Sequence, residues 1–385
     1  MLGRDSRPRI AFITAHDPTS RRSWSGIPYY VFRALQREIG PVVHVGNWQP
    51  RGTILRGKVM SILSRKCFGR PYDYTHGTRL AKEYGRHLTK ILKSDPYDFV
   101  FACSASTQVA YLDTDLPILY FADTTYSRMI NYYPQFTKLW PRNIRDGMEI
   151  ESLGIHKSAA LLYASKWAAD SAIQDYGAEK KCTHVIPMGA NIPNNPPLMD
   201  CSDFDPQSPF HLLFLGVDWE RKGGPIAWEA FQCLREQGFN IRMTICGCVP
   251  PSRIRDPNLQ IIRFLDKNRP EDQSAFNELL SSSNLLLLPT KAECFGVVFC
   301  EASAYGIPSL STRTGGVESA VHEGINGYLF ASTAGGDSYA QKVAELICSK
   351  EQYTKLRKTS RDLYESTLNW NAWAKRVKDI CSTLQ

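Results

Sequence analysis

Short apolar runs alternate with segments of helical periodicity along the whole chain. Such runs, with little alternation of apolar and polar residues, are typical of strands buried on both faces of a parallel sheet. In the first half of the chain we predict strands at residues 9–14, 41–45, 98–104, 117–123, 159–165 and 184–187. Helix-like segments between the runs then predict a first α/β domain.

A second series of strands follows, at residues 210–216, 241–247, 259–265, 284–289 and 307–312. Between the first two, Ala227, Phe231 and Leu234 recur at helical spacing, and Gly238 supplies a stop signal. The segment 187–209 is dense in Pro, Asn, Asp and Ser, which is typical of a linker. The pattern therefore predicts two doubly wound, Rossmann-like parallel-sheet domains, residues 1–190 and 191–365, facing a central cleft.

Composition fits a folded globular protein of two domains. The 385 residues are 43% hydrophobic and 22% charged, with a formal net charge of +8 that suits anionic ligands, acidic membranes or nucleic acid. The start has no apolar stretch of signal-peptide length, and no run is long enough to span a bilayer. We therefore expect a cytoplasmic protein. The eleven cysteines are scattered without paired spacing, which argues against disulfides.

Two acids flank the start of one predicted helix. The strand at 284–289 is followed by a loop with Glu293, and a helix beginning near Gly296 carries Glu301. Free N–H groups at a helix start suit an anion such as a diphosphate, and two spaced carboxylates could each bind a pair of hydroxyls. The alternative is an acid that complements the helix dipole, followed by a surface glutamate.

Two further loops follow strands of the same predicted domain. The first, FLGVDWERKGG, contains Arg221 and Lys222 beside two glycines, which would let the backbone approach a phosphate. A solvated basic turn is the alternative. The second has Gly315 and Gly316 after the strand at 307–312. Since the carboxyl ends of parallel strands share one edge, we expect all three loops to meet there.

The order of these motifs closely resembles the nucleotide-sugar glycosyltransferases of family 4, which have the GT-B fold. The resemblance rests on Arg-Lys-Gly-Gly, on a glutamate with a second one eight positions later, and on GIPSLSTRTGGVESAVHEGINGYLF. It covers most of residues 187–330 and is looser in the N-terminal half, at 25–38, 163–177 and 185–192. It implies an N-terminal acceptor domain, a C-terminal donor domain and a last helix, residues 366–385, that packs back on the first domain.

The resemblance also implies roles for residues. Glu293 would contact the donor sugar, Glu301 the ribose hydroxyls, and Arg221 with Lys222 the diphosphate. The other donor-binding residues that it implies are Gly26, Gly216, Phe295, Gly296, Val297 and Val298. Such enzymes are of hexosyltransferase type, retain the anomeric configuration and generally need no metal or other cofactor, so we expect a nucleotide-sugar donor and no metal site.

The chain departs from the family pattern at several positions. Val217 stands where many members have Arg, Cys294 where Gly is common, and Gly26 where a glycine pair is usual. Arg263 and Asp266 fall in the region that usually flanks the nucleobase. These positions leave the nucleotide and the sugar open. The commonest acceptor in the family, a glycan, polysaccharide or glycolipid precursor, is our expectation here.

Acceptor chemistry rests on fewer residues. Asp123 follows the strand at 117–123 and would orient or deprotonate the acceptor, with a capping or turn aspartate as the alternative. His16, at the end of the first strand, is either a loop histidine or a functional one. Residues 51–70 carry six Lys or Arg and no acid, and they include Val59, Ile62 and Leu63. This segment could dock on the anionic inner face of a membrane, or it could be a solvated helix.

Three further interpretations complete the picture. Asp113 and Asp115 match a metal-binding pattern of another glycosyltransferase fold, but they precede a strand and so lie at the wrong end of the sheet. Cys246 and Cys248 lack nearby ligands for zinc, so buried thiols are the simpler interpretation. Rival functions are a nucleotide-sugar hydrolase or epimerase on the same fold, a non-catalytic nucleotide-sugar binding protein, and a nucleic-acid or scaffold protein. No nucleic-acid motif supports the last.

Overall fold

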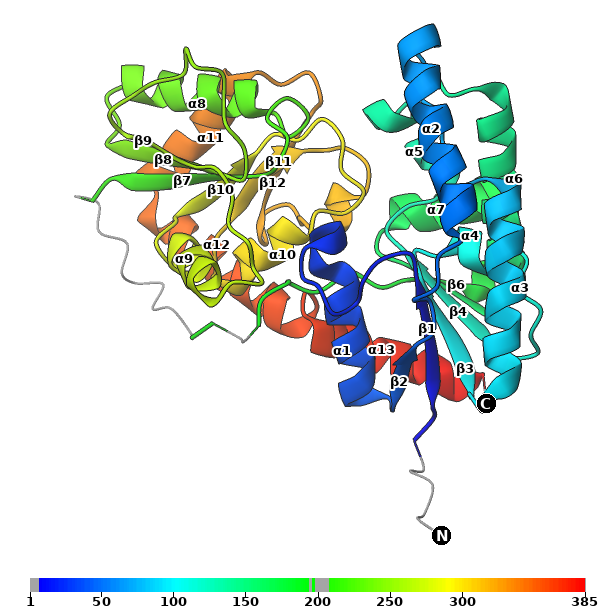
Figure 1. The fold of residues 1–385 in the computed structure, drawn as a ribbon. Helices are drawn as coiled ribbons and strands as arrows, with labels where there is room; N and C mark the ends of the chain where they lie inside the picture. The colour runs from blue at the N-terminus through cyan, green and yellow to red at the C-terminus, as the bar shows by residue number, and fades with distance from the viewer. Residues whose placement is uncertain (1–6, 194–195, 198–207, 385) are drawn as a thin grey trace. The chain divides into compact units, whose positions relative to one another are not determined.

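A computed structural model of the protein describes residues 7–193, 196–197 and 208–384. The chain divides into two compact units: the first unit is residues 1–186 with 374–385, and the second unit is residues 187–373 (Figure 1). The return to the first unit thus begins at Ala374, whereas the sequence placed it at residue 366. Part of the predicted linker, 187–209, lies outside the described residues. The predicted central cleft stays a prediction.

The first unit is built on a six-stranded parallel sheet with the order β2-β1-β3-β4-β5-β6. The chain leaves β1 for β2 and then crosses back to β3 on the other side of β1. The carboxyl ends of β1 and β3 therefore flank a topological switch point, where ligands bind in doubly wound folds. The strands are β1 (Ile10–Thr14), β2 (Val42–His44), β3 (Phe99–Cys103), β4 (Ile118–Ala122), β5 (Ala160–Tyr163) and β6 (Thr183–Val185).

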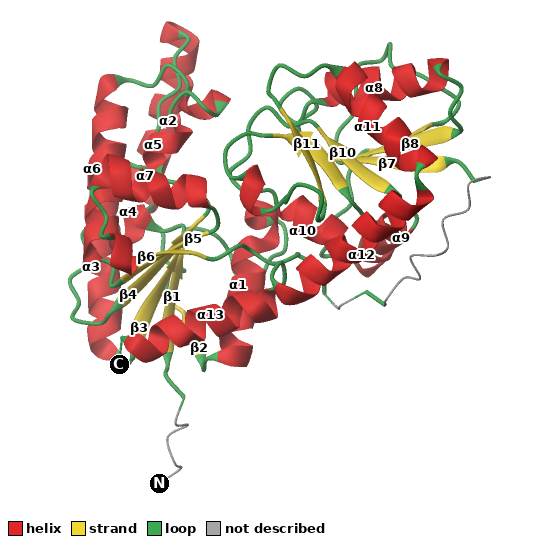
Figure 2. Cartoon of the chain, turned by 180° about the vertical axis from the view of Figure 1, so that it is seen from behind, coloured by secondary structure: helices red, strands yellow, loops and turns green. Residues whose placement is uncertain are grey.

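Helices cover both faces of this sheet (Figure 2). Leu80, Tyr84, Leu88 and Leu92 of α3 recur every fourth residue, so one face of that helix is buried against the sheet. The elements are η1 (Ser23–Gly26), α1 (Ile27–Glu38), α2 (Arg51–Phe68), α3 (Thr78–Ser94), α4 (Ser106–Val109), α5 (Tyr126–Met129), η2 (Pro134–Phe136), α6 (Pro141–Lys157), α7 (Lys166–Tyr176), η3 (Lys180–Cys182) and α13 (Trp370–Thr383).

The second unit has another six-stranded parallel sheet, in the order β12-β11-β10-β7-β8-β9. This is the strand order of the dinucleotide-binding Rossmann fold, and its switch point lies between β7 and β10. The strands are β7 (Phe210–Leu215), β8 (Ile241–Cys246), β9 (Leu259–Ile262), β10 (Leu285–Leu288), β11 (Ser309–Thr312) and β12 (Gly327–Phe330). The first five match predicted strands, whereas β12 had been taken as loop.

The helices of the second unit also lie on both faces of their sheet (Figure 2). All side chains of β10 are fully buried, as expected of a central parallel strand. The helices are α8 (Gly224–Glu236), α9 (Pro270–Ser281), α10 (Val297–Ala304), η4 (Val317–Ser319), α11 (Gly336–Cys348) and α12 (Lys350–Ser366). The predicted fold class, two doubly wound parallel-sheet domains, is confirmed.

Candidate functional site in the second unit

The loops that leave β7 and β10 are tied together at the switch point. The N–H of Lys291 donates to the carbonyl of Arg221 at 2.8 Å, and Nη1 of Arg221 donates to the carbonyl of Ala292, also at 2.8 Å. The third predicted loop joins them, because the N–H of Gly316 donates to the carbonyl of Glu293 at 3.1 Å. The convergence of three loops on one edge is therefore present in the structure.

A charged cluster of Arg221, Lys222 and Glu293 lies at this edge. Nζ of Lys222 forms an ion pair with Oε2 of Glu293, and Nη1 of Arg221 lies 3.9 Å from the same oxygen. Arg221 is held from the other side by Asp218, whose Oδ1 accepts from the Arg221 N–H at 3.0 Å. Lys222 and Glu293 are both largely removed from solvent, with side chains 11% and 14% exposed. Nε of Arg221 also lies 3.7 Å from Oδ2 of Asp218, so the two cations are balanced by two carboxylates here, and an anionic ligand would have to compete with these carboxylates for Arg221 and Lys222.

Two glycines allow the first loop to pack this closely. Gly223 has φ of 78°, and a Cβ there would lie 1.8 Å from the carbonyl oxygen of Pro289. A Cβ at Gly216 would lie 2.8 Å from Cγ of Lys222. Gly216 therefore makes room for the Lys222 side chain, and Gly223 lets the start of α8 approach β10.

In the sequence, the N-terminus of α10 closely follows Glu293 of the charged cluster. Its N-cap Gly296 has φ of 90°, and a Cβ there would lie 2.5 Å from the ring of Phe299. The N–H groups of Val297 and Val298 belong to the first turn, which has no preceding helical carbonyls to pair with. Phe295 is fully buried, backbone included, so this predicted donor-binding residue has no exposed atom for a ligand in this structure.

Glu301 has a partner of its own. Nζ of Lys267 donates to its Oε1 at 2.6 Å, and the backbone N–H of Asn191 also bonds the carboxylate. Burial raises the pKa of Glu301, although Lys267 and Asn191 oppose the shift. The sequence did not single out Lys267, which lies 34 positions away. The signal in the sequence was that Lys267 lies in RFLDKN, the segment expected to flank the nucleobase. Of the two residues singled out in that segment, Arg263 is exposed and Asp266 forms a turn with Asn268.

The predicted acceptor residues lie at strand ends of the first unit. Asp123 directly follows β4 and is half-buried beside Cys103, the buried last residue of β3. His16 follows β1 and stacks on Trp24 with ring centroids 6.0 Å apart, and burial lowers its pKa. Gly26 ends a run of three left-handed residues, with φ of 45° at Trp24, 55° at Ser25 and 85° at Gly26. This loop is therefore conformationally strained.

Two other sequence patterns were considered as metal sites, one with Asp113 and one with Cys246 and Cys248. Asp113 precedes β4 and pairs with Lys93 at 2.8 Å in an exposed salt bridge. Burial raises the pKa of Cys246 and of Cys248 to about 11. In the part of the chain that the structure describes, no three His, Cys, Asp or Glu side chains are grouped so that they could hold a metal ion. In the same part, no helix is both long and apolar enough to cross a membrane.

Residues 209–349 match the family described as glycosyl transferases group 1. The matched residues all lie in the second unit. The D-inositol 3-phosphate glycosyltransferase of Paenarthrobacter aurescens (strain TC1) is 27% identical over 203 residues, which make up 49% of this chain and 48% of that relative. The chain therefore spans about half the length of this relative. The group 1 match contains Arg221, Lys222, Glu293 and Glu301.

Solved structures extend the fold likeness to nearly the whole chain. Sucrose-phosphate synthase from Thermosynechococcus elongatus superposes with a TM-score of 0.67 at 14% identity, over 98% of this chain and 99% of that one. Anabaena Alr3699/HepE in complex with UDP gives 0.65 at 14% identity, over 98% and 100%. The two units together thus have the GT-B glycosyltransferase fold.

Proposed function

We propose that the chain transfers a sugar from a nucleoside diphosphate sugar to a hydroxyl group of an acceptor. The observation that carries the proposal is the cluster of Arg221, Lys222 and Glu293 at the switch point of the unit that matches the group 1 glycosyl transferases. Two cations and a helix N-terminus there suit a diphosphate, both bound and departing. The UDP complex of a structural neighbour makes uridine nucleotides the first donors to test.

Donor binding would rearrange the charged cluster. The diphosphate takes Arg221 and Lys222 as partners, and Glu293, released from Lys222, accepts hydrogen bonds from the sugar hydroxyls. In the reaction the bond between C1 and the diphosphate oxygen breaks, and a bond from C1 to the acceptor oxygen forms. The acceptor proton passes to the departing diphosphate. We propose retention of configuration, and cationic side chains in place of a metal ion.

We propose that Glu301 binds the ribose, at the end of the donor away from the transferred sugar. Its carboxylate, oriented by Lys267 and the Asn191 N–H, offers two acceptor oxygens to the ribose hydroxyls. Burial raises the pKa of Glu301 and so disfavours its charged form. Binding a pair of ribose hydroxyls by a charged hydrogen-bond acceptor would explain why a glutamate occupies this buried position.

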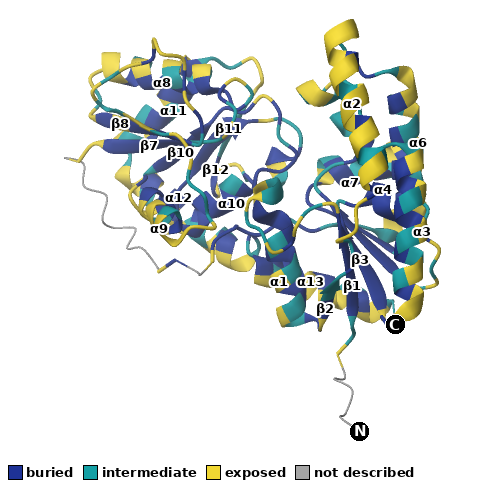
Figure 3. Cartoon of the chain, viewed as in Figure 1, coloured by how far each residue is buried: buried dark blue, intermediate teal, exposed yellow. Residues whose placement is uncertain are grey.

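We propose that α2 docks the protein on the anionic inner face of a membrane that carries a lipid-linked acceptor. α2 is mostly exposed (Figure 3). Its exposed large apolar side chains are Leu55, Val59, Met60, Ile62, Leu63 and Phe68. Basic residues surround them and residues 51–70 hold no acid, so apolar insertion and attraction to anionic lipid would act together.

Vesicle sedimentation tests the docking of α2. Wild type should bind phosphatidylglycerol vesicles more strongly than phosphatidylcholine vesicles, and added salt should weaken binding. The double variant Leu55→Ser, Phe68→Ser should bind less, whereas Val249→Ser, at an exposed apolar position in the second unit, should bind as wild type. Equal binding by both variants would contradict the proposal.

Product analysis separates transfer from its rivals. Purified protein is incubated with UDP-glucose and other nucleotide sugars in EDTA, with and without candidate acceptors, both neutral, such as myo-inositol, and charged, such as a D-inositol phosphate. Transfer predicts a glycosylated acceptor whose anomeric configuration matches the donor. Release of nucleotide without any acceptor would indicate a hydrolase, an isomeric nucleotide sugar an epimerase, and binding without turnover a non-catalytic protein. Activity that needs an added divalent cation would contradict metal independence.

A further inference from the structure

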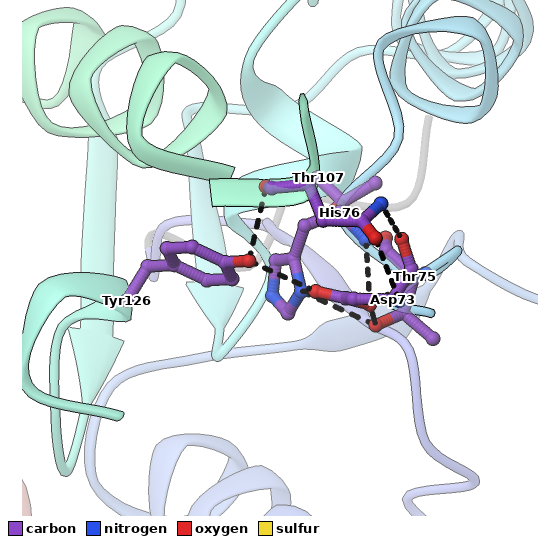
Figure 4. A network of polar contacts seen from close by, with 6 residues as sticks. Asp73, Thr75, His76, Thr107 and Tyr126 are labelled. Atoms are coloured by element: carbon purple, nitrogen blue, oxygen red, sulfur yellow. Dashed lines mark hydrogen bonds and ion pairs between the residues drawn. The ribbon is translucent and has the colours of Figure 1, made fainter. Parts of the chain in front are cut away.

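A buried polar network in the first unit is not used by the donor chemistry (Figure 4). It centres on Asp73, in the connection between α2 and α3. Asn143 of α6 fixes this connection: its Nδ2 donates to the carbonyl of Asp73 at 2.8 Å, and its Oδ1 accepts from the Asp73 N–H at 3.3 Å. Oγ1 of Thr107 in α4 donates to the carbonyl of Thr75 at 3.0 Å.

The Asp73 carboxylate is surrounded by donors. Oδ1 accepts from the N–H of Thr75 at 2.9 Å and from its hydroxyl at 2.6 Å. Oδ2 bonds Nδ1 of His76 at 2.7 Å and the hydroxyl of Tyr126 at 3.3 Å. Burial alone would raise the pKa of Asp73, but the charge of His76 and these hydrogen bonds lower it to about 2. Asp73 is therefore ionised at neutral pH and can only accept.

An ionised Asp73 fixes the tautomer of His76. Nδ1 must carry the proton that it shares with Asp73, so in the neutral ring Nε2 is unprotonated and can accept a hydrogen bond. Among the described residues no hydrogen bond to Nε2 is formed, and the His76 side chain is 18% exposed. The ring is also held by Tyr126, with centroids 4.7 Å apart. His76 is thus a rigid imidazole with one available nitrogen.

The network lies at the edge of the sheet where the predicted acceptor residues lie. Thr107 belongs to α4, which follows β3, and Tyr126 belongs to α5, which follows β4. Asp123 occupies the same connection as Tyr126, three residues earlier. His76 therefore joins the carboxyl ends of β3 and β4 from a segment far away in the sequence.

We propose that Nε2 of His76 binds a hydroxyl group of an uncharged sugar or polyol acceptor, with Asp73 as the residue that positions the ring. The proposal rests on the proposed transferase function and names its acceptor class. Above the raised pKa of His76 the imidazole is neutral and, with the ionised Asp73, the pair carries a negative charge, which disfavours a phosphate or carboxylate at this place. The acceptor chemistry thus differs from that in the name of the inositol phosphate relative.

Two substitutions of His76 distinguish binding from a structural role. His76→Asn keeps a donor near the Nδ1 position for Asp73 but has no atom at Nε2, whereas His76→Gln reaches the Nε2 position and loses Nδ1. We expect His76→Asn to weaken acceptor binding about threefold to tenfold, the loss of one hydrogen bond, without affecting folding. A purely structural role predicts the opposite order, with His76→Asn harmless and His76→Gln impaired. The control is His156→Gln, at an exposed position of α6.

The experiment uses the full chain with ¹⁵N-labelled histidine, saturated with UDP, at a pH above the raised pKa of His76, and follows the Nε2 signal of His76. The probes are myo-inositol, D-glucose and N-acetyl-D-glucosamine, with D-inositol 3-phosphate and D-glucose 6-phosphate as charged counterparts. We expect at least one neutral probe to move the signal and its phosphorylated counterpart to bind at least tenfold more weakly. Tighter binding of a phosphorylated probe, or no response to any neutral one, would overturn the proposal. UDP binding in the same samples tests the donor site separately.

The pH dependence supplies a second readout. Burial would lower the pKa of His76, but Asp73 and the Glu151 carboxyl outweigh it and raise the pKa. Tyr126 faces the ring as a neutral phenol. Binding of the neutral probe should therefore weaken as pH falls through this raised pKa, because protonated Nε2 no longer accepts. In Asp73→Asn the pH at which probe binding weakens should be lower than in wild type; an unchanged pH would contradict the positioning role. If Asp73→Asn does not fold, the pH dependence of the wild-type protein alone decides.

Discussion

At the scale of residues, the donor site rests on contacts between charged side chains that come from different loops. Arg221, Lys222 and Glu293 were predicted from their loops, and the structure brings them together. Lys267 was missed because its role depends on contact with Glu301, 34 positions away. His76 was missed for the same reason, because nothing next to it in the sequence indicates Tyr126. Residue types at strand ends are visible in a sequence, whereas pairs formed by the fold are not.

Glu301→Gln tests the donor role at this scale. The amide keeps the size of the side chain but loses the charge that would bind the ribose hydroxyls. Since hydrogen bonds to a charged group contribute about 1.5–3 kcal/mol, the Kd of the nucleotide that binds should rise about tenfold or more, measured by calorimetry. Glu318→Gln, at an exposed carboxylate of the same unit, is the control. Unchanged affinity in Glu301→Gln would remove the assignment.

Asp73→Asn should destabilise the protein in a pH-dependent way. A folded pKa of about 2 against an ordinary 3.8 means that the ionised form stabilises the fold by about 2 kcal/mol above pH 4. The contribution is lost as pH falls through the folded pKa, so the variant and wild type should converge between pH 4 and pH 2. Denaturant titrations at several pH values measure this difference. A difference independent of pH would contradict an ionised Asp73 in the folded protein.

At the scale of elements, the pattern of apolar runs was sufficient to predict eleven strands but did not predict β12. Its four residues GYLF follow Asn326 at the end of a loop rich in Gly, and they are only partly buried at the sheet edge. The site depends on the loops more than on the strands. Their glycines were predicted to approach a ligand, and the structure shows in addition that they let the loops approach one another.

Gly223→Ala tests that loop packing, with Gly238→Ala as its matched control. Both glycines have positive φ, 78° and 83°, but a Cβ at Gly238 would meet no atom within 4 Å. Gly238→Ala should cost about 1 kcal/mol, the price of a left-handed alanine. Gly223→Ala should cost more and also weaken nucleotide binding, because a clash with Pro289 would displace Arg221 and Lys222. Equal effects on stability and binding would show that the close approach does not matter.

At the scale of the whole molecule, two parallel sheets were predictable because each strand is a nearly continuous apolar run. The strand orders were not, since periodicity carries no information about which strands are neighbours. The two sheets differ in this respect: the second has the Rossmann order, and the first has its switch point between β1 and β3. In each unit, the residues to which we assign donor or acceptor chemistry lie at carboxyl ends of strands or, as His76 does, contact the elements that follow them. This common placement is what joins donor and acceptor chemistry in one proposal.

The most direct test of the central claim is a thermal-shift titration of the full chain, in EDTA, with UDP, GDP and ADP. A ligand that binds only the native state must raise the melting temperature as its concentration exceeds Kd. We predict that at least one nucleotide raises it, and that Lys222→Ala, which removes a diphosphate partner, abolishes most of the rise. No rise with any of the three from folded wild-type protein would contradict a nucleoside diphosphate site in the second unit.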